Sequence, residues 1–273
     1  IDATATGRLT PAVRVAAQTL FVATNGLHLA PFTNWATAAT NLQAALDAAA
    51  AGSVIQVANG VYTPTSTVLV LKDVHLRGVN GDSNTVVRRG TAPATMRVFL
   101  VCASNAVVEG FTITNGVVNN SELWFGAGVT LYAGTVRRCA IVKNDAINNA
   151  YGGGVYMTGG TVSGCTLRAN SSWINGGGVY MSGGRVLASR IVANTAGGNP
   201  GYSGGGVYMS GGIVANCEVR DNAGGTGGTA GGIRLDGGAI VNCTIAHNTS
   251  GTGGGGGVYR GAAGGVTNSI VYF

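Results

Sequence analysis

The residue types of acid–base chemistry occur together near the C-terminal end of the chain, as Glu218, Arg220, Asp221 and His247. Asp221 and His247 occupy the same position in two consecutive sequence repeats, so we expect them on neighbouring strands. A carboxylate beside an imidazole can exchange a proton with it, and it can equally form a structural ion pair. Glu218 and Arg220 are expected to project outward from one strand, with Arg190 one repeat earlier. The pattern favours a structural ion pair and leaves Glu218, Asp221 and His247 as the acid–base candidates.

A row of tyrosines is the second feature that could do chemistry. One position of the repeat, expected to face outward, is occupied by Thr130, Tyr156, Tyr180, Tyr208, Arg234 and Tyr259. Stacked aromatic rings can bind sugars, can pack against another subunit, or can simply stabilise the sheet that carries them. Sheet stabilisation is the interpretation that we favour. The candidates for a ligand or subunit contact are Tyr156, Tyr180, Tyr208, Arg234 and Tyr259.

A sequence repeat positions all of these residues. The tract GGGVY begins at Gly152, Gly176, Gly204 and Gly255, and degenerate copies begin at Gly126 and Gly231. The first branched residues of successive copies are separated by 24 to 28 residues, a period that is typical of repeat architectures. Each copy is too short to bury its own apolar face, but stacked copies bury a continuous core. We therefore predict a parallel β-helix with one repeat per coil and three short strands in each coil.

Two further positions of the repeat carry recurrent residues. A small residue recurs as Cys139, Cys165, Ser189, Cys217, Cys243 and Ser269. An asparagine closes five copies, at Asn144, Asn170, Asn194, Asn222 and Asn248. Because Asn tolerates a left-handed backbone and its amides can stack, we expect these asparagines in turns. The cysteines are expected to be buried thiols that act as small apolar fillers, and whether any pair forms a disulfide stays open.

An Ala-rich segment precedes the repeats and predicts an amphipathic helix over residues 35–52. Its apolar face is expected to contain Leu42, Ala45, Leu46 and Ala49. The helix should end at Gly52, before a strand and the sequence Asn59-Gly60-Val61-Tyr62. This arrangement resembles the N-terminal capping helix and first coil of the pectin-lyase-like right-handed parallel β-helix proteins. The later GGGVYMSGG and NCTIAHN copies resemble large secreted bacterial proteins built from such repeats.

The resemblance covers about residues 20–273 and implies an all-β fold, a right-handed parallel β-helix (solenoid) with a short N-terminal capping α-helix. Residues 20–273 would form a single domain, with regular coils of about 26 residues over 126–273. For activity the resemblance implies little, because the family includes lyases, hydrolases, adhesins and proteins of unknown role.

Enzymes of this family have motifs that this chain lacks. Their hydrolases resemble one another in clustered aspartates with a nearby histidine, and their lyases hold Ca²⁺ with several acids and use Arg or Lys as the base. The chain has ten Asp and Glu residues in all, and no two are adjacent. Neither motif can be carried over, so no catalytic residue is assigned, and the sequence leans against an enzyme without excluding one. No metal-ligand spacing of Cys and His occurs, and no cofactor or metal is predicted.

The net charge of +6 would suit an acidic partner such as nucleic acid or an anionic glycan. The arginines are scattered over several outward positions, about one per coil, so nucleic-acid binding is not predicted. No segment approaches the ~20 apolar residues of a membrane helix, and no membrane span is predicted. The chain starts at Ile1, as a processed protein would, and with the family resemblance this predicts an extracellular or cell-surface location.

The two ends of the chain suggest self-assembly. The last repeat copy ends directly after its strands, which would leave Val271, Tyr272 and Phe273 at an uncapped coil. Residues 1–19 form an N-terminal extension that contains the alternating apolar residues Val13 and Val15. We expect the extension of one molecule to cover the open coil of the next, which would produce a head-to-tail filament. The alternative is that the chain is part of a longer protein.

The predicted function is thus a non-catalytic extracellular structural or surface protein, including a filament subunit whose main partner is a second copy of itself. The alternative is a carbohydrate-active protein, either a divergent polysaccharide lyase or hydrolase or a module that binds cell-surface glycans. The scarcity of acids disfavours the enzyme, whereas the tyrosine row keeps glycan binding open.

Overall fold

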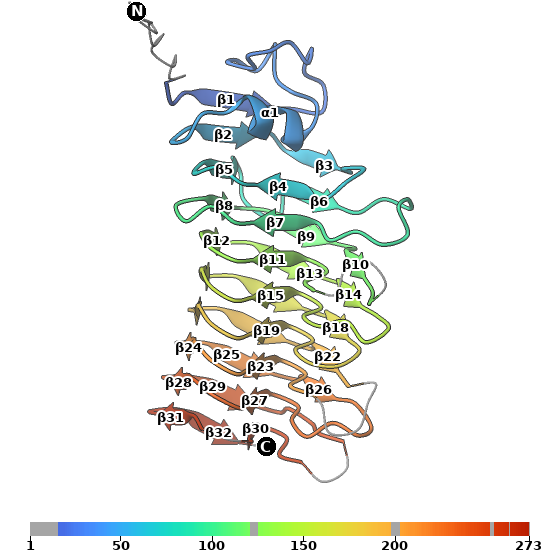
Figure 1. Ribbon diagram of the computed structural model, residues 1–273, viewed down its shortest axis with the longest axis vertical. Helices are drawn as coiled ribbons and strands as arrows, with labels where there is room; N and C mark the ends of the chain where they lie inside the picture. Colours follow the sequence, from blue (N-terminus) through green and yellow to red (C-terminus); the bar gives the residue numbers. More distant parts are fainter. Residues whose placement is uncertain (1–15, 121–124, 198–202, 252–253, 262, 273) are drawn as a thin grey trace, which may run out of the picture.

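The computed structural model describes residues 16–120, 125–197, 203–251, 254–261 and 263–272. These residues contain 32 strands and a single α-helix. The strands form a right-handed parallel β-helix whose coils stack along one long axis (Figure 1). The predicted fold class is therefore confirmed. Among the described residues, no helix is long and apolar enough to cross a membrane.

Four sheets run along the axis, and all pairings between their strands are parallel. Sheet 1 has ten strands: β1 (Thr19–Val22), β2 (Val54–Val57), β5 (His75–Gly78), β8 (Val107–Glu109), β12 (Thr135–Arg137), β16 (Thr161–Ser163), β20 (Arg185–Leu187), β24 (Ile213–Ala215), β28 (Ala239–Val241) and β31 (Gly265–Thr267). Sheet 2 has nine: β3 (Gly60–Tyr62), β6 (Thr85–Arg88), β9 (Thr112–Thr114), β13 (Ala140–Val142), β17 (Thr166–Arg168), β21 (Arg190–Val192), β25 (Glu218–Arg220), β29 (Thr244–Ala246) and β32 (Ile270–Tyr272).

Sheet 3 has eight strands: β4 (Val68–Val70), β7 (Phe99–Val101), β11 (Val129–Leu131), β15 (Val155–Met157), β19 (Val179–Met181), β23 (Val207–Met209), β27 (Ile233–Leu235) and β30 (Val258–Arg260). Sheet 4 has five short strands: β10 (Val117–Val118), β14 (Asp145–Ala146), β18 (Ser171–Ser172), β22 (Thr195–Ala196) and β26 (Ala223–Gly224). Three strands per coil were predicted, so sheet 4 is an addition. It forms in the central coils. Four of its strands directly follow an asparagine of the repeat, as β14 follows Asn144, and β10 follows Gly116.

Alternation decides which side chains enter the core. In sheet 3 the first and third residues of each strand point inward, as Val155 and Met157 do at 0% exposure, whereas Tyr156 between them is half-buried. In most three-residue strands of sheets 1 and 2 the middle residue points inward, as Val162 does in β16, whereas Val61 in β3 is exposed. Each such side chain contributes about 2 kcal/mol by its burial. The inward residues form one core cluster that extends through the solenoid.

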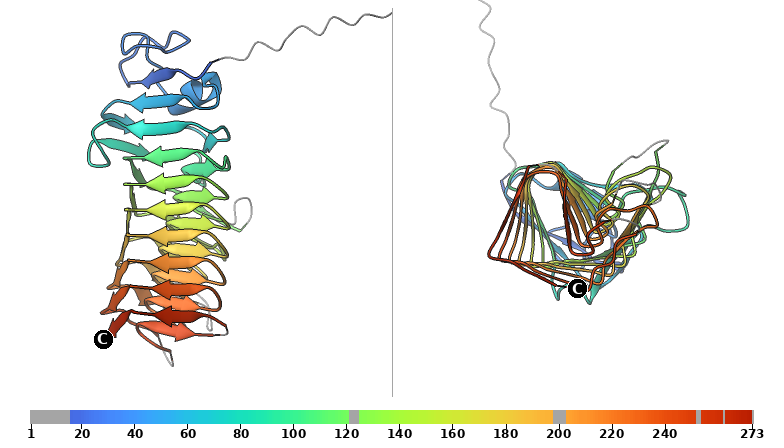
Figure 2. Two further views of the ribbon diagram at one scale, coloured as in Figure 1. Left: turned by 90° about the vertical axis from the view of Figure 1, so that its left-hand side faces the viewer. Right: turned by 90° about the horizontal axis from the view of Figure 1, so that it is seen from below.

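Neighbouring coils pair in register. Tyr156 pairs with Tyr180, and Tyr180 pairs with Tyr208, so like residues lie above one another. The distance between adjacent strands is about 4.8 Å in any sheet. Seen along the axis, the coils superpose on one another (Figure 2). A residue type that fits one coil therefore fits the next, which is the physical reason for the repeat in the sequence.

Single residues in the left-handed region make the bends that follow sheets 1 and 2. Arg138 (φ 50°) bends the chain after β12, and Lys143 (φ 53°) bends it after β13. The prediction that the recurrent asparagines adopt this conformation is wrong. Ala193 (φ 54°) adopts it, and Asn194 is the residue that follows. The Asn194 side chain that follows this bend lies in the interior, at 0% exposure.

The five asparagines form a buried column, here called the asparagine ladder (Asn144, Asn170, Asn194, Asn222 and Asn248). Asn194 shows the pattern. Its Nδ2 donates to the Leu167 carbonyl (3.0 Å) and to Asn222 Oδ1 (2.9 Å). Its Oδ1 accepts hydrogen bonds from the backbone N–H and the Nδ2 of Asn170, both at 3.0 Å. The predicted stacking of amides is confirmed. The inner amides join their own coil to the coils on both sides, whereas Asn248 at the end of the ladder bonds to Asn222 and Val219 of the preceding coil.

The ladder cysteines Cys139, Cys165, Cys217 and Cys243 are free and buried, as predicted. Their thiols make weak hydrogen bonds to backbone carbonyls. Cys139 Sγ, for example, lies 3.3 Å from the Arg137 carbonyl oxygen. Burial is the main cause that raises the pKa of the Cys139 thiol well above its usual value. These thiols behave as small apolar fillers.

One short helix, α1 (Leu42–Ala48), lies at the N-terminal end of the solenoid and packs against β1, β2 and β4 (Figure 1). The helix is shorter than the predicted 35–52. It begins after Asn41, whose Oδ1 accepts from the Ala44 N–H at 2.9 Å, and it ends before Gly52. At the C-terminal end of α1, Lys72 Nζ donates hydrogen bonds to three backbone carbonyls, those of Leu46 (3.2 Å), Asp47 (2.7 Å) and Ala49 (2.8 Å). The predicted apolar face, Leu42, Ala45, Leu46 and Ala49, is buried.

We expect Asn194→Ala to reduce the free energy of unfolding by about 3 kcal/mol, because it leaves buried backbone and amide groups of two neighbouring coils without partners. The matched control is Asn80→Ala, which removes an exposed hydrogen bond to Asn59 and should cost less than about 0.5 kcal/mol. Chemical denaturation of both variants measures the difference. An equal loss in the two variants would show that the buried ladder is not a main source of stability.

Candidate functional site

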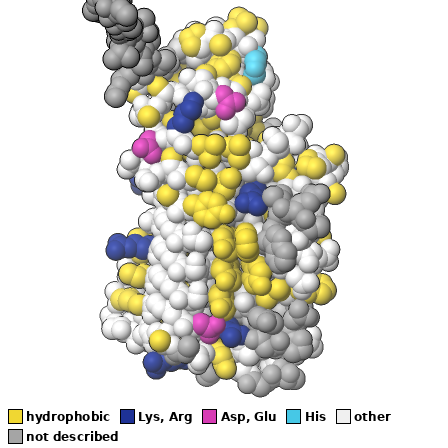
Figure 3. All heavy atoms as spheres, in the orientation of Figure 1, with side chains coloured by type: hydrophobic (Ala, Val, Ile, Leu, Met, Phe, Trp, Pro, Cys, Tyr) yellow, Lys and Arg dark blue, Asp and Glu magenta, His cyan; other side chains and the backbone are white. Residues whose placement is uncertain are grey.

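The tyrosine row lies on the outward face of sheet 3, where its rings stack along the axis. The ring centroids of Tyr156 and Tyr180 are 5.1 Å apart, and those of Tyr180 and Tyr208 are 4.8 Å apart. The interplanar angles are only 10° and 17°. Phe125 continues the stack at 4.3 Å from Tyr156, and we call these four residues the aromatic column. Figure 3 shows a stripe of hydrophobic side chains along this face.

Arg234 extends the column on the side of the C-terminal coils. Its Cζ lies 5.7 Å from the ring centroid of Tyr208 and 5.8 Å from that of Tyr259, so the guanidinium lies between two rings. Asp236 accepts from Arg234 Nε with both carboxylate oxygens, at 3.2 Å each. Burial, followed by the hydrogen bond with Asp236, raises the pKa of the Tyr208 phenol. Tyr208 therefore stays protonated at neutral pH.

The stacking limits what the aromatic column can bind. A sugar ring that packs on an aromatic side chain uses the face of that ring. Both faces of Tyr180 are covered, by Tyr156 on one side and Tyr208 on the other, and Tyr151 makes a further T-shaped contact with the ring at 5.3 Å, so no ring face of Tyr180 remains for a ligand. This geometry favours the stabilisation of sheet 3, at about 1 kcal/mol for each stacked pair beyond simple burial.

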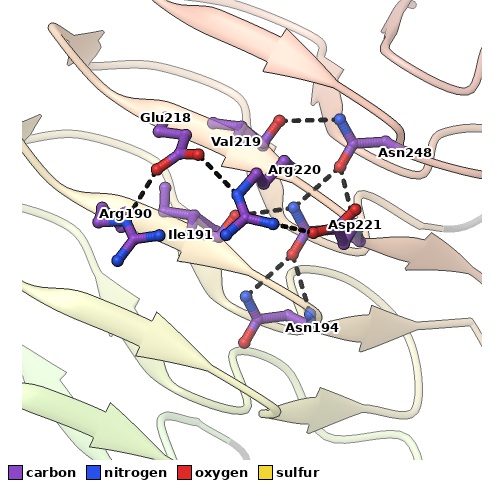
Figure 4. A network of polar contacts seen from close by, with 9 residues as sticks. Arg190, Ile191, Asn194, Glu218, Val219, Arg220, Asp221 and Asn248 are labelled. Carbon is purple, nitrogen blue, oxygen red and sulfur yellow. Dashed lines mark hydrogen bonds and ion pairs between the residues drawn. The ribbon is translucent and has the colours of Figure 1, made fainter. Parts of the chain in front are cut away.

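The acid–base candidate Glu218 and its neighbour Arg220 project outward from β25 as predicted, and Arg190 of β21 joins them (Figure 4). Arg190 Nε donates to Glu218 Oε2 at 2.8 Å, and Arg220 Nε donates to Glu218 Oε1 at 2.6 Å. Both carboxylate oxygens are thus occupied by guanidinium groups. The hydrogen bond from Arg190 is the main cause that lowers the pKa of Glu218. A carboxyl group held ionised in this way is a poor proton donor.

The structure does not join Asp221 to His247, although the two residues occupy equivalent bends of neighbouring coils (φ 55° and 52°). Asp221 forms an ion pair with Arg220 through the Arg220 Nη1. The His247 ring instead contacts Tyr272 edge to face, with centroids 5.5 Å apart. The two side chains therefore have separate partners, and the geometry supplies no proton-transfer pair.

A second charged cluster lies at Glu109, the last residue of β8, which is only 7% exposed. Glu109 Oε2 accepts from Arg137 Nε (3.0 Å) and Nη2 (2.8 Å), and it lies 2.8 Å from His75 Nε2. Glu109 Oε1 accepts from Arg138 Nη1 at 2.9 Å. We call Glu109, His75, Arg137 and Arg138 the Glu109 cluster. It gathers one carboxylate, one imidazole and two guanidinium groups from three successive coils.

The electrostatics of the Glu109 cluster follow from these contacts. Burial by itself would raise the pKa of Glu109, but the hydrogen bonds from Arg137, His75 and Arg138 outweigh it and lower the pKa to about 2. Glu109 is therefore ionised at all physiological pH values. Its chemical role in this geometry is to hold the two guanidinium groups, rather than to donate a proton.

The sequence alone reveals neither this cluster nor a partner for His75. His75 and Glu109 are 34 residues apart, and Glu109 and Arg137 are 28 apart, so the upstream coils do not keep the regular repeat length. The feature that could have revealed the cluster is the pairing of residues between neighbouring strands of sheet 1. Arg77, Glu109 and Arg137 occupy one position of sheet 1 on three consecutive strands, and their charges alternate. That alternation becomes visible only when the irregular coils are aligned.

The predicted assembly residues are only partly described. Val271 is 40% exposed and Tyr272 is 46% exposed in the last strand, with Ile270 beside them at 62%. Val13, Val15 and Phe273 lie outside the described residues. Across the described ranges, no group of three or more His, Cys, Asp or Glu side chains lies close enough to hold a metal ion.

Comparison with known proteins adds little to this geometry. No family model matches the sequence, and no curated protein matches it. One solved structure is similar in shape, the pectin methylesterase from Aspergillus niger in a penultimately deglycosylated form, at 14% sequence identity. The match covers 93% of this chain and 86% of that chain, with a TM-score of 0.47. A likeness of this extent carries no argument about activity.

We expect Glu109→Gln to be destabilising at pH 7 by about 2 kcal/mol, because the neutral amide loses two guanidinium ion pairs. The folded-state pKa is depressed, so this contribution is present above the ordinary glutamate pKa. It should disappear as the pH falls from about 4.5 toward about 2. Unfolding followed against pH checks the sign. Glu218→Gln, in which the carboxylate itself is more exposed (36% against 9% for Glu109), is the control and should cost less than about 1 kcal/mol.

Tyr180→Ala should lower stability by about 2 kcal/mol through the loss of two stacked ring pairs, whereas Tyr180→Phe keeps both pairs and should stay within about 0.5 kcal/mol. Thermal unfolding of the two variants measures this. If Tyr180→Ala unfolds like the parent protein, the aromatic column does not stabilise sheet 3, and a contact role becomes the better interpretation.

Proposed function

We propose that this chain is a non-catalytic structural protein of an extracellular or cell-surface location, in which the β-helix acts as a rigid rod. The observation that carries the proposal is the asparagine ladder, because it joins five consecutive coils through buried amides. With ten strands in sheet 1, the rod is about 45 Å long at the usual strand spacing. A function that depends on length and stiffness requires such continuity.

Charged side chains support the same proposal, because they also connect coils. Arg190 on β21 binds Glu218 on β25, and Arg137 on β12 binds Glu109 on β8. The aromatic column adds a third line of contacts along the axis. These polar and aromatic groups make their contacts with neighbouring coils, which is the use expected of them in a structural rod.

The proposed assembly is an extension of the rod by end-to-end stacking. The apolar side chains of the last described coil fit either a further coil of the same polypeptide or the first coil of a second copy. The head-to-tail contact with the N-terminal extension stays a prediction, since Val13 and Val15 lie outside the described residues.

Glycan binding is the second candidate, and one observation favours it. A shallow groove of about 510 Å³ runs across several coils between sheets 3 and 1. Its lining includes Thr135, Thr161 and Arg185, together with Gly160 and Gly184, which directly precede the last two of these residues. Hydroxyl and guanidinium groups along an extended groove suit a linear chain of sugar hydroxyls. The groove is open, however, and has no buried polar group that would hold a ligand firmly.

Electron microscopy of the protein over a range of concentrations tests the structural proposal, with antibody labelling of intact source cells to test its location. We expect rods or longer filaments of one width, and labelling at the cell surface. When the protein is incubated with a panel of polysaccharides, we expect no new reducing or unsaturated sugar ends. Cleavage of any polysaccharide, or labelling confined to the cell interior, would contradict the proposal. Saturable binding to one glycan, abolished by Arg185→Ala but not by Arg168→Ala, would support the second candidate instead.

A further inference from the structure

A cavity lies beside the Glu109 cluster, at the bend between sheets 1 and 2. It has a volume of about 230 Å³. Its lining includes Arg77, Gly78, Asp82, Glu109, Gly110 and Arg138. Residues from three coils contribute, so the cavity exists only in the folded solenoid. The aromatic column lies on a different sheet, and the groove between sheets 3 and 1 has a separate lining.

Glycine keeps the cavity open at its base. A Cβ on Gly78 would lie 2.3 Å from the Gly110 carbonyl oxygen, so no larger residue fits there without moving the next coil. Gly110 itself has a φ of +76°, which an L side chain rarely adopts. The two glycines bring the backbones of consecutive coils together and leave the space above them to the charged side chains.

The guanidinium groups around this cavity outnumber the carboxylates. Arg77, Arg137 and Arg138 supply three positive charges, whereas Glu109 and Asp82 supply two negative charges, which leaves one positive charge with His75 neutral. In-register pairing places Glu109 between Arg77 and Arg137 on sheet 1. Glu109 binds Arg137 and Arg138 and not Arg77.

Two guanidinium groups retain free donors that a ligand can use. Among the described residues, no hydrogen bond or ion pair engages the exposed side chain of Arg77. Arg138 uses Nη1 for Glu109, and its side chain is otherwise 76% exposed. The oxygens of Glu109 are already occupied by donors from Arg137, Arg138 and His75. The buried carboxylate therefore positions Arg138 without offering a free acceptor to a cation.

We propose that this cavity binds a small oxyanion, such as a carboxylate, sulfate or phosphate group, between the guanidinium groups of Arg77 and Arg138. Planar guanidinium donors match oxyanions in geometry and give charge-assisted hydrogen bonds. A singly charged anion neutralises the excess positive charge of the site. Of the two carboxylates in the lining, Glu109 is ion-paired with Arg137 and Arg138, whereas Asp82 forms no ion pair among the described residues and opposes such a ligand, which makes its substitution diagnostic. Arg77 and Arg138 are binding residues, and Glu109 is a positioning residue.

Isothermal titration with sodium acetate, sulfate and phosphate, at constant ionic strength maintained with chloride, tests the proposal and separates the three oxyanion classes. We expect one saturable site for at least one of them. Arg77→Gln and Arg138→Gln should each weaken binding about tenfold, whereas Asp82→Asn should strengthen it several-fold. Arg88→Gln, an exposed arginine of β6 outside the cavity lining, is the matched control and should bind like the parent protein.

Three outcomes would overturn the proposal. Equal weakening in Arg88→Gln and Arg77→Gln would mean nonspecific attraction to the net positive charge. Loss of binding in Asp82→Asn would mean that the cavity prefers a cation. The absence of saturable binding for all three salts would mean that the charges serve only the fold. Because no hydrogen bond or ion pair among the described residues engages the exposed Arg77 side chain, its variant should unfold at the parent temperature, which separates a binding defect from a folding defect.

Discussion

The in-register stacking of coils through buried amides is the interaction on which this structure depends. A ladder asparagine such as Asn170 donates to a backbone carbonyl of the preceding coil, that of Ile141, and to the side-chain amide of the next coil, that of Asn194. An amide without these partners would cost about 1–3 kcal/mol in the apolar interior. The five coils that the ladder joins must therefore present an asparagine at the same height. That requirement holds these coils in register and aligns their tyrosines, thiols and valines with it.

Close approach of the backbone is the second constraint. A Cβ on Gly153 would lie 2.0 Å from the Ser171 carbonyl oxygen, and one on Gly154 would lie 2.5 Å from the Gly178 carbonyl oxygen. The GGG tracts thus occur where the chain leaves sheet 4 for sheet 3 and the next coil passes directly below. Larger residues would force the coils apart and break the asparagine ladder.

Charged residues have two distinct environments in this fold. Glu218 is a partly exposed carboxylate between two arginines, and its ion pairs are worth little because water screens them. Glu109 makes the same kind of contact but is nearly buried, so its partners are held in one geometry. The difference explains why a cavity with oriented donors exists beside Glu109, whereas the Glu218 network, made of residues singled out in the sequence, is only a set of surface pairs.

The sequence by itself determined the repeat, the parallel β-helix, the inward residues and the burial of the cysteines, because stacked coils must repeat the same residue at the same position. It also predicted that Glu218 and Arg220 point outward. Only the tertiary structure decided where the left-handed bends fall, since local preference favours Asn194 for the left-handed position, whereas Ala193 adopts it and the Asn194 side chain is buried in the ladder. The Glu109 cluster likewise required the structure, because coils of unequal length hide the pairing of His75 and Arg137 with Glu109. Local periodicity specifies a regular core, whereas contacts between irregular coils depend on a register that only the folded chain defines.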